Sequence, residues 1–186
     1  MSASIHVILR FVGATALASL LALAAGCGTS AKVGTAPKPE VSVARPFTDV
    51  QVILSAEARA RFEDEAKGFD IDALSAVVRQ RLDAERMFSE QERPDGLRAT
   101  ITVTNLRFRG PIAARMLGFL AGLDEIAADV VVQPAASPAG EYRFSMVTTH
   151  GGGGYLYGSV ERRLDAMYTS FADKFIEVLR APAGSK

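Results

Sequence analysis

Apolar and polar residues alternate along several stretches of the chain, and this period of two is typical of a strand with one buried face. The clearest stretch is 99–104, where alanine, isoleucine and valine alternate with threonine. The apolar positions change phase near Asn105, which predicts a bulge or a change of face there. An earlier alternation over 41–54 is interrupted at Pro46 and predicts a first strand or a broken pair of strands.

Two further alternating stretches, 126–132 and 142–148, are separated by a short segment rich in proline and glycine. Short connections of this composition are typical of the turn between paired antiparallel strands. These two stretches are therefore predicted to form a hairpin.

Three other segments carry apolar residues at helical spacing or are rich in helix-favouring residues. The first, 55–67, is highly charged and has a candidate N-cap at Ser55. The second begins at Asp70 or Asp72 and continues to about residue 87. The last follows a candidate cap at Ser159 and has the longest apolar stripe, made by Val160, Leu164, Met167, Phe171, Phe175 and Leu179.

The order of these elements predicts the α+β class. We expect a two-layer sandwich, with a mainly antiparallel sheet of about four strands and two or three helices on one face. The 186 residues suffice for a single domain, placed at 41–181. Segment 27–40 is rich in glycine, serine, threonine, alanine and proline and is predicted to be a flexible tether, and 182–186 is a tail.

The N-terminal segment 1–26 has the layout of a secretory signal and is excluded from the fold. An apolar run at 11–25 follows Arg10 and precedes small residues. At about 15 residues, this run is shorter than a membrane-spanning helix needs. Ala22-Leu23-Ala24 fits ordinary cleavage, which would release a secreted protein with a free thiol at Cys27, and an uncleaved anchor is a second alternative.

A third interpretation rests on Leu23-Ala24-Ala25-Gly26-Cys27, which resembles the lipobox of bacterial lipoproteins. The resemblance implies that diacylglycerol is joined to the Cys27 thiol, that the signal is cut before this residue and that the new amine is acylated. Thiolates are strong nucleophiles, and two or three acyl chains hold a protein on a bilayer essentially permanently. Cys27 is thus the predicted lipid attachment site, and the lipid bilayer is a predicted partner.

The residue after the cysteine indicates which membrane is involved. In lipoproteins of this class an aspartate there is commonly a signal for retention in the inner membrane, and this chain has Gly28 instead. The expected localisation is the cell envelope, on the outer membrane facing the periplasm if the cell is a diderm bacterium.

Composition excludes several function classes. The chain has 21 basic and 21 acidic residues, and Arg10 is the only charged residue before Cys27, so the remainder has a net charge of about −1. Nucleic-acid binding by charge requires a strongly basic surface, and none is indicated. Cys27 is the only cysteine, which excludes an intramolecular disulfide. Histidine occurs only at His6 and His150, so no metal site and no cofactor are predicted.

No catalytic residue is assigned, and the chain is predicted not to be an enzyme. The run from His150 to Gly154 is similar to the HGGG oxyanion loop of some esterases, but the G-x-S-x-G nucleophile elbow is missing, so the run is interpreted as a glycine-rich turn. The acidic cluster at 63–65 and the charged residues 161–163 are interpreted as solvated helix faces.

The segment 110–122 joins two predicted strands and is apolar apart from one arginine. About a dozen residues cannot cross a bilayer as a helix. Three alternatives remain: the segment packs under the sheet, meets a partner or second subunit, or touches lipid. The residues of a partner-contact loop here would be Arg115, Met116, Leu117, Phe119 and Leu120.

The layout after the tether resembles small bacterial envelope lipoproteins with a lipobox and one α+β domain, among them accessory lipoproteins of cell-wall synthesis and the curli-secretion channel subunit. Arg115, Gly118, Gly122 and the helix 159–180 carry this resemblance, and no activity is transferred from it. We predict a membrane-anchored envelope lipoprotein acting as a non-enzymatic protein-binding or assembly module on the periplasmic side, with an envelope protein or a second copy as partner. The alternative, a periplasmic ligand-binding or hydrolytic lipoprotein, predicts a deep pocket near His150 or the acidic helix.

Overall fold

The computed structural model describes residues 27–33, 45–65, 68–91, 93–109, 123–137, 140–150 and 159–181. In chain order its elements are β1 (Cys27–Val33), β2 (Phe47–Leu54), α2 (Ala56–Glu65), α3 (Ile71–Ala84), β3 (Leu97–Arg107), β4 (Asp124–Pro134), β5 (Tyr142–His150) and α5 (Val160–Arg180). The predictions for the signal at 1–26, for the tether at 34–40 and for the tail at 182–186 lie outside the described residues.

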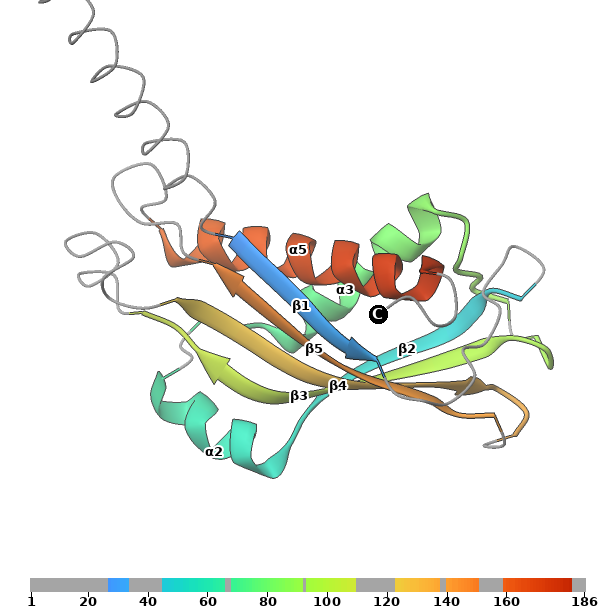
Figure 1. Cartoon of the computed structure of the whole chain (residues 1–186), viewed down its shortest axis with the longest axis horizontal. Helices are drawn as coiled ribbons and strands as arrows, with labels where there is room; N and C mark the ends of the chain where they lie inside the picture. The colour runs from blue at the N-terminus through green and yellow to red at the C-terminus, as the bar shows by residue number, and fades with distance from the viewer. Residues whose placement is uncertain are drawn as a thin grey trace, which may run out of the picture.

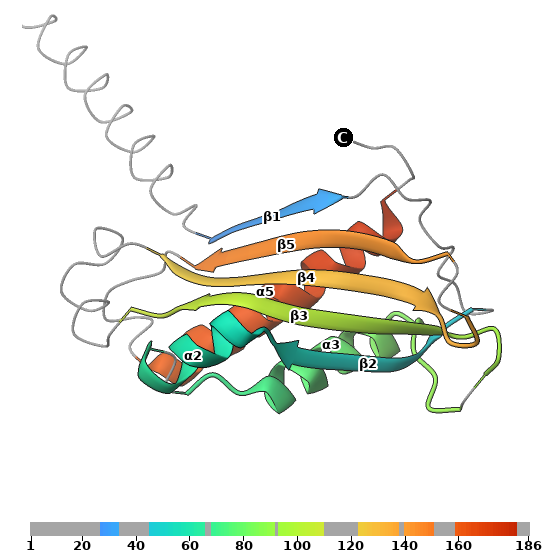
Figure 2. The same cartoon turned by 90° about the horizontal axis from the view of Figure 1, so that it is seen from below.

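The described strands form one five-stranded sheet in the order β1-β5-β4-β3-β2. Neighbouring strands are antiparallel except β2 and β3, which are parallel and are connected through α2 and α3. α3 and α5 cover one face of the sheet, and Figures 1 and 2 show α2 on the opposite side. The predicted α+β two-layer architecture is confirmed, with five strands in place of about four.

β1 is a strand that the sequence did not predict. The composition of 27–40 indicates a flexible tether, and this prediction is wrong for Cys27–Val33, which pairs with β5 from Cys27 opposite His150 to Val33 opposite Phe144. Without β1, β5 would present an edge of unpaired backbone groups, and main-chain pairing at such an edge does not require apolar alternation. The sheet therefore begins at Cys27 itself.

The irregularity predicted near Asn105 is confirmed. The register between β3 and β4 shifts between Val103 and Asn105, where the apolar positions change phase. β4 and β5 form the predicted hairpin, with Val132 opposite Tyr142 nearest the turn. The bulge lets β3 keep buried side chains on both sides of the shift, as Val103 and Leu106 show.

The helices begin at the predicted caps. Ser55 Oγ accepts a hydrogen bond from the Ala58 amide at 3.1 Å, and Ser159 Oγ accepts one from the Arg162 amide at 3.3 Å. Each cap satisfies a backbone donor that has no partner within its helix.

Asp70 connects the start of α3 to α5. Its carboxylate accepts hydrogen bonds from the backbone amides of Asp72 and Ala73, and its own amide donates to Tyr168 Oη at 2.8 Å. Burial raises the pKa of the Tyr168 hydroxyl to about 12, so this group stays protonated. The contact fixes the entry of α3 relative to α5.

The core lies between the sheet and the two helices α3 and α5. Phe175 of α5 is fully buried, and its ring centroid lies 6.0 Å from that of Phe47 in β2 and 6.1 Å from that of Phe144 in β5. One side chain of α5 thus contacts residues from two strands that are not neighbours in the sheet. Aromatic contacts at these distances add to the free energy gained by burying the rings.

Candidate functional site at the Cys27 end of the sheet

Several chain segments meet at one end of the sheet, which we call the Cys27 end. Cys27 begins β1, Asp124 begins β4, His150 ends β5, and Arg109 follows β3. Figure 1 shows this end at the left, where α5 also begins. Cys27 and Asp124 are both in register with His150, so these three residues form a row across three strands. With about 4.8 Å between neighbouring strands, the Cα atoms of Cys27 and Asp124 are about 10 Å apart.

A buried ionic cluster lies at this end. Asp124 is fully buried, and its Oδ1 accepts hydrogen bonds from the backbone amide of Arg109 at 2.8 Å and from the Arg109 Nε at 3.2 Å. Arg109 Nη2 donates to Asp124 Oδ2 at 3.2 Å and to the His150 carbonyl oxygen at 3.3 Å. This guanidinium therefore ties together the ends of β3, β4 and β5.

Arg163 of α5 completes the cluster. Its Nη1 donates to Asp124 Oδ2 at 2.7 Å, and its Nη2 donates to the Arg109 carbonyl oxygen at 3.0 Å. Its side chain is only 3% exposed, so the expectation that residues 161–163 are solvated is wrong for this residue. Arg163 is buried because it lies on the same face of α5 as Met167, a core residue four positions later.

The cluster is suited to holding elements together and not to proton transfer. Two guanidinium groups share the single carboxylate of Asp124, and each of them also donates to a backbone carbonyl oxygen. The arrangement joins α5 to three strand ends at the Cys27 end.

His150 is buried beside this cluster, with 4% of its surface exposed. Burial lowers the pKa of its imidazole, and the nearby Arg109 and Arg163 lower it further, while Asp124 acts in the opposite direction. The oxyanion-loop interpretation is not supported at this position, because the side chain faces the protein interior. The glycines that follow it lie outside the described residues.

The burial of His150 gives a pH dependence that can be measured. In the chain from residue 27 onward it is the only histidine, so its NMR titration is unambiguous, and we expect a midpoint below the ordinary value of 6.5. The unfolded chain then binds this proton more readily than the folded chain, so the free energy of unfolding decreases as the pH falls below about 6.5. The His150→Gln variant should lose less stability over the same range. A midpoint above 6.5 would contradict a buried neutral imidazole.

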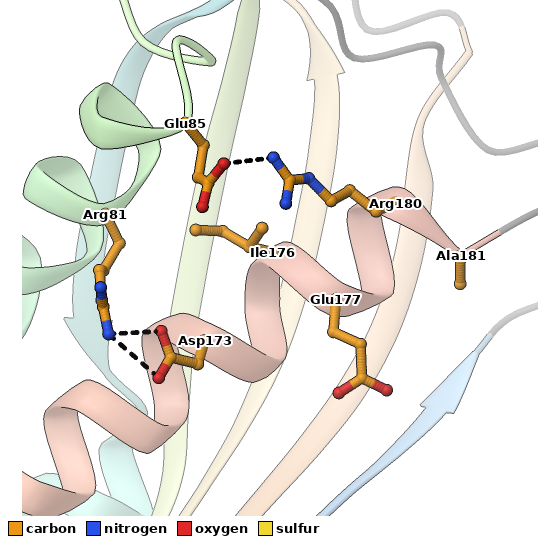
Figure 3. Close-up of a pocket in the computed structure, with 7 residues that line it drawn as sticks. All are labelled: Arg81, Glu85, Asp173, Ile176, Glu177, Arg180 and Ala181. Carbon is orange, nitrogen blue, oxygen red and sulfur yellow. Dashed lines mark hydrogen bonds and ion pairs between the residues drawn. The ribbon is translucent and has the colours of Figure 1, made fainter.

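The described residues also line two open grooves. One, of about 450 Å³, lies between α3 and α5 and is lined by Arg81, Glu85, Asp173, Ile176, Glu177, Arg180 and Ala181. Figure 3 shows Ile176 lying between two ion pairs that cross this groove, Arg81 with Asp173 and Arg180 with Glu85. These charges bind one another at the surface, where such pairs contribute little to stability.

The second groove, of about 500 Å³, runs along residues 68–72, between α2 and α3 in the chain. Asp70, which lines this groove, caps α3, and its carboxylate already accepts hydrogen bonds from backbone amides of that helix. His150 lines neither groove. The ligand-binding alternative expects a deep pocket near His150 or the acidic helix, and neither described groove is lined by His150 or by a residue of α2.

Of the predicted site residues, Cys27 is placed by the structure at the start of β1. The partner-contact loop of Arg115, Met116, Leu117, Phe119 and Leu120 lies outside the described residues, but Arg109 and Leu123, which flank segment 110–122, are both at the Cys27 end. The side chains of the acidic cluster at 63–65 are likewise not described.

The cluster of Arg109, Asp124 and Arg163 was not predicted from the sequence. One signal for it exists in the sequence: Arg109 and Asp124 are opposite charges at the two borders of an apolar segment that joins neighbouring strands. Nothing in the sequence adds Arg163 to this pair, because that requires the docking of α5.

No described helix combines the length and the apolar character needed to cross a membrane. Within the described ranges, no three histidine, cysteine, aspartate or glutamate side chains are grouped so that they could hold a metal ion.

Comparisons with known proteins give only distant likenesses. No protein-family model matches the chain, and no curated protein matches it. Among solved structures, it is similar to the PelC dodecamer from Paraburkholderia phytofirmans, with 14% identity and a TM-score of 0.47 over 82% of this chain and 99% of that chain. A single-substitution variant of that dodecamer matches with 13% identity and a TM-score of 0.45 over 83% of this chain and 99% of that chain. At this degree of likeness, neither the dodecameric state nor any role of those proteins is carried over to this chain.

Proposed function

We propose that this chain is a membrane-anchored envelope lipoprotein, and that its α+β domain is a non-enzymatic protein-binding or assembly module on the periplasmic side. The proposal joins two features: the lipobox-like segment that ends at Cys27 and the position of Cys27 as the first residue of the folded sheet. Two or three acyl chains on this residue would hold the whole domain at the bilayer surface.

The position of Cys27 is the observation that carries the proposal. A cut directly before Cys27 would remove segment 1–26 and leave every described strand and helix intact. A cut at the earlier Ala22-Leu23-Ala24 would leave extra residues ahead of β1, with a thiol that has no assigned chemistry. Cleavage before Cys27 would place the new N-terminus at the first residue of the described sheet.

The buried charges favour a binding or assembly role over hydrolysis. Arg109, Asp124 and Arg163 bond to one another and to backbone carbonyls, so they serve to join strands to α5. His150, the one histidine of the domain, is too buried to meet a substrate in this conformation. Both described grooves, between α3 and α5 and along residues 68–72, are open, and the charges that cross the first are paired with one another.

Intact-mass spectrometry of the membrane fraction tests the anchor, with the full chain expressed beside a Cys27→Ala variant. We expect a chain that starts at Cys27 and carries two or three acyl groups, and complete loss of these groups in the variant. A matched control, Ser30→Ala, changes a residue of the same strand and should keep the lipid. An unmodified chain in the soluble fraction would disprove the lipoprotein assignment.

Sizing the lipidated protein in detergent by light scattering, after cross-linking in intact cells, tests the assembly role. The proposal predicts a species larger than one chain or a specific cross-linked envelope protein. A lipidated monomer that cross-links to nothing, in cells where other lipoproteins do cross-link, would contradict the binding role and leave the anchor standing.

A further inference from the structure

We infer that the Cys27 end of the sheet is the surface of this domain that faces the phospholipid bilayer, and that the pairing of β1 with β5 holds it there without a flexible spacer. This inference rests on the proposed acylation of Cys27 and goes beyond it, because a lipid anchor alone leaves the orientation of a domain open.

The first step is that β1 contains no unpaired residue that could act as a spacer. All seven residues of β1 are paired with β5, beginning with Cys27 opposite His150. The atom that would carry diacylglycerol therefore belongs to a residue inside the sheet ladder. A tether of about 14 flexible residues, as composition predicts, would instead allow an end-to-end distance of about 20 Å. With β1 in place, the separation between the sheet and the headgroups is about one side-chain length.

The second step is the rigidity of this end. Arg109, Asp124 and Arg163 join β3, β4 and α5 by buried charge-assisted hydrogen bonds, and Arg109 also binds the His150 carbonyl of β5. β5 in turn pairs with β1. A force applied at Cys27 is thus passed to four strands and α5, so the anchor orients the whole domain.

The third step is an exposed apolar side chain at the same end. Leu123, directly before β4, is 39% exposed and is one of two large hydrophobic side chains that are prominently exposed in the described ranges. Leu123 is next to Asp124, which shares the row of Cys27 and His150. An exposed leucine beside a lipid anchor fits the interfacial region of a bilayer.

Charge does not drive the contact between the Cys27 end and the bilayer. The exposed described side chains near this end include Arg107 and Arg162, and the acidic Glu161 and the half-buried Glu125 lie among them. The signs of these described side chains balance, so they favour neither zwitterionic nor anionic lipid. This separates it from basic surfaces that require acidic headgroups.

The opposite end of the sheet gives a built-in reference point. β4 has 11 residues, so at about 3.3 Å per residue the turn between β4 and β5 lies about 35 Å from Asp124. Ser137 in this turn is exposed. A probe there should stay outside the bilayer if the Cys27 end faces it.

The test uses the full lipidated protein with one added cysteine, Leu123→Cys or Ser137→Cys, because acylation of Cys27 leaves the new thiol as the only one to label. Each labelled protein is placed in phosphatidylcholine vesicles with and without brominated lipid as quencher, and the measurement is repeated with added phosphatidylglycerol. We expect a severalfold greater loss of fluorescence at position 123 than at position 137, unchanged by lipid charge.

A matched control inserts about 20 glycine and serine residues between Cys27 and Gly28, which keeps the lipid and adds about 25 Å of reach. Quenching at position 123 should then fall towards that at position 137. Equal quenching at both positions in protein whose mass shows acylated Cys27 would overturn the inference while leaving the lipoprotein assignment intact. Absence of acyl groups on Cys27 would overturn both.

Discussion

Replacing Asp124 by asparagine should lower the free energy of unfolding by about 3–5 kcal/mol, because it leaves two buried guanidinium groups without their shared counter-charge. Asp124 is fully buried, and its oxygens accept from Arg109 and from Arg163. The amide can accept through one atom only and places donors beside a cation. Urea unfolding of the chain from residue 27 onward, in a Cys27→Ser background, measures the effect.

Asp129→Asn is the matched control, because it makes the same chemical change on the same strand. Asp129 is exposed and accepts a hydrogen bond from Ser145 Oγ at 2.6 Å. Its loss should cost less than about 1 kcal/mol, as is usual for a solvated group. If Asp124→Asn costs no more than this control, the ion pairs do not hold α5 to the strand ends, and the rigidity assigned to the Cys27 end would be disproved.

Truncating Phe175 to alanine should have an effect of similar size, about 3–5 kcal/mol, for a different reason. The ring is fully buried between Phe47 and Phe144, so its removal forfeits apolar burial and both aromatic contacts, and it leaves a cavity between α5 and the sheet. The same urea titration measures this loss, and the midpoint should fall with little change in slope.

Phe175→Leu separates packing from the specific ring contacts. Leucine keeps an apolar side chain in the site, so we expect a clearly smaller loss than with alanine. Equal losses in the two variants would mean that the ring contacts with Phe47 and Phe144 account for the effect. A loss below about 1 kcal/mol with alanine would contradict the placement of this side chain in the core.

Asp124→Asn and Phe175→Ala affect different parts of α5, the first through Arg163 and the second directly. Arg163 is in the first turn of α5 and Phe175 is in its second half, so one side chain is held at the Cys27 end and the other over the middle of the core. If orientation at the membrane depends on a rigid sheet end, Asp124→Asn should also make the position of Cys27 relative to the rest of the domain more variable. Phe175→Ala should weaken the domain as a whole.

The sequence by itself determined the elements whose signals are local. Alternation placed β3, β4 and β5, and the phase change at Asn105 placed the bulge. Side-chain caps at Ser55 and Ser159 placed two helix starts, and helical spacing placed the start of α3 at Asp70 or Asp72. These features depend on residues within a few positions of one another, so a pattern along the chain contains them.

Only the tertiary structure decided the parts that depend on distant neighbours. β1 forms because β5 offers an unpaired edge, which the composition of Cys27–Val33 does not reveal. The Asp124 cluster forms because Arg163, 39 residues further along the chain, is carried to the sheet end by α5. The sequence does not show whether a charged side chain is solvated or buried, because its partner is decided by how the helices and strands pack. For this reason the sequence indicated a cysteine anchor, while the rigid sheet end at that anchor came from the fold alone.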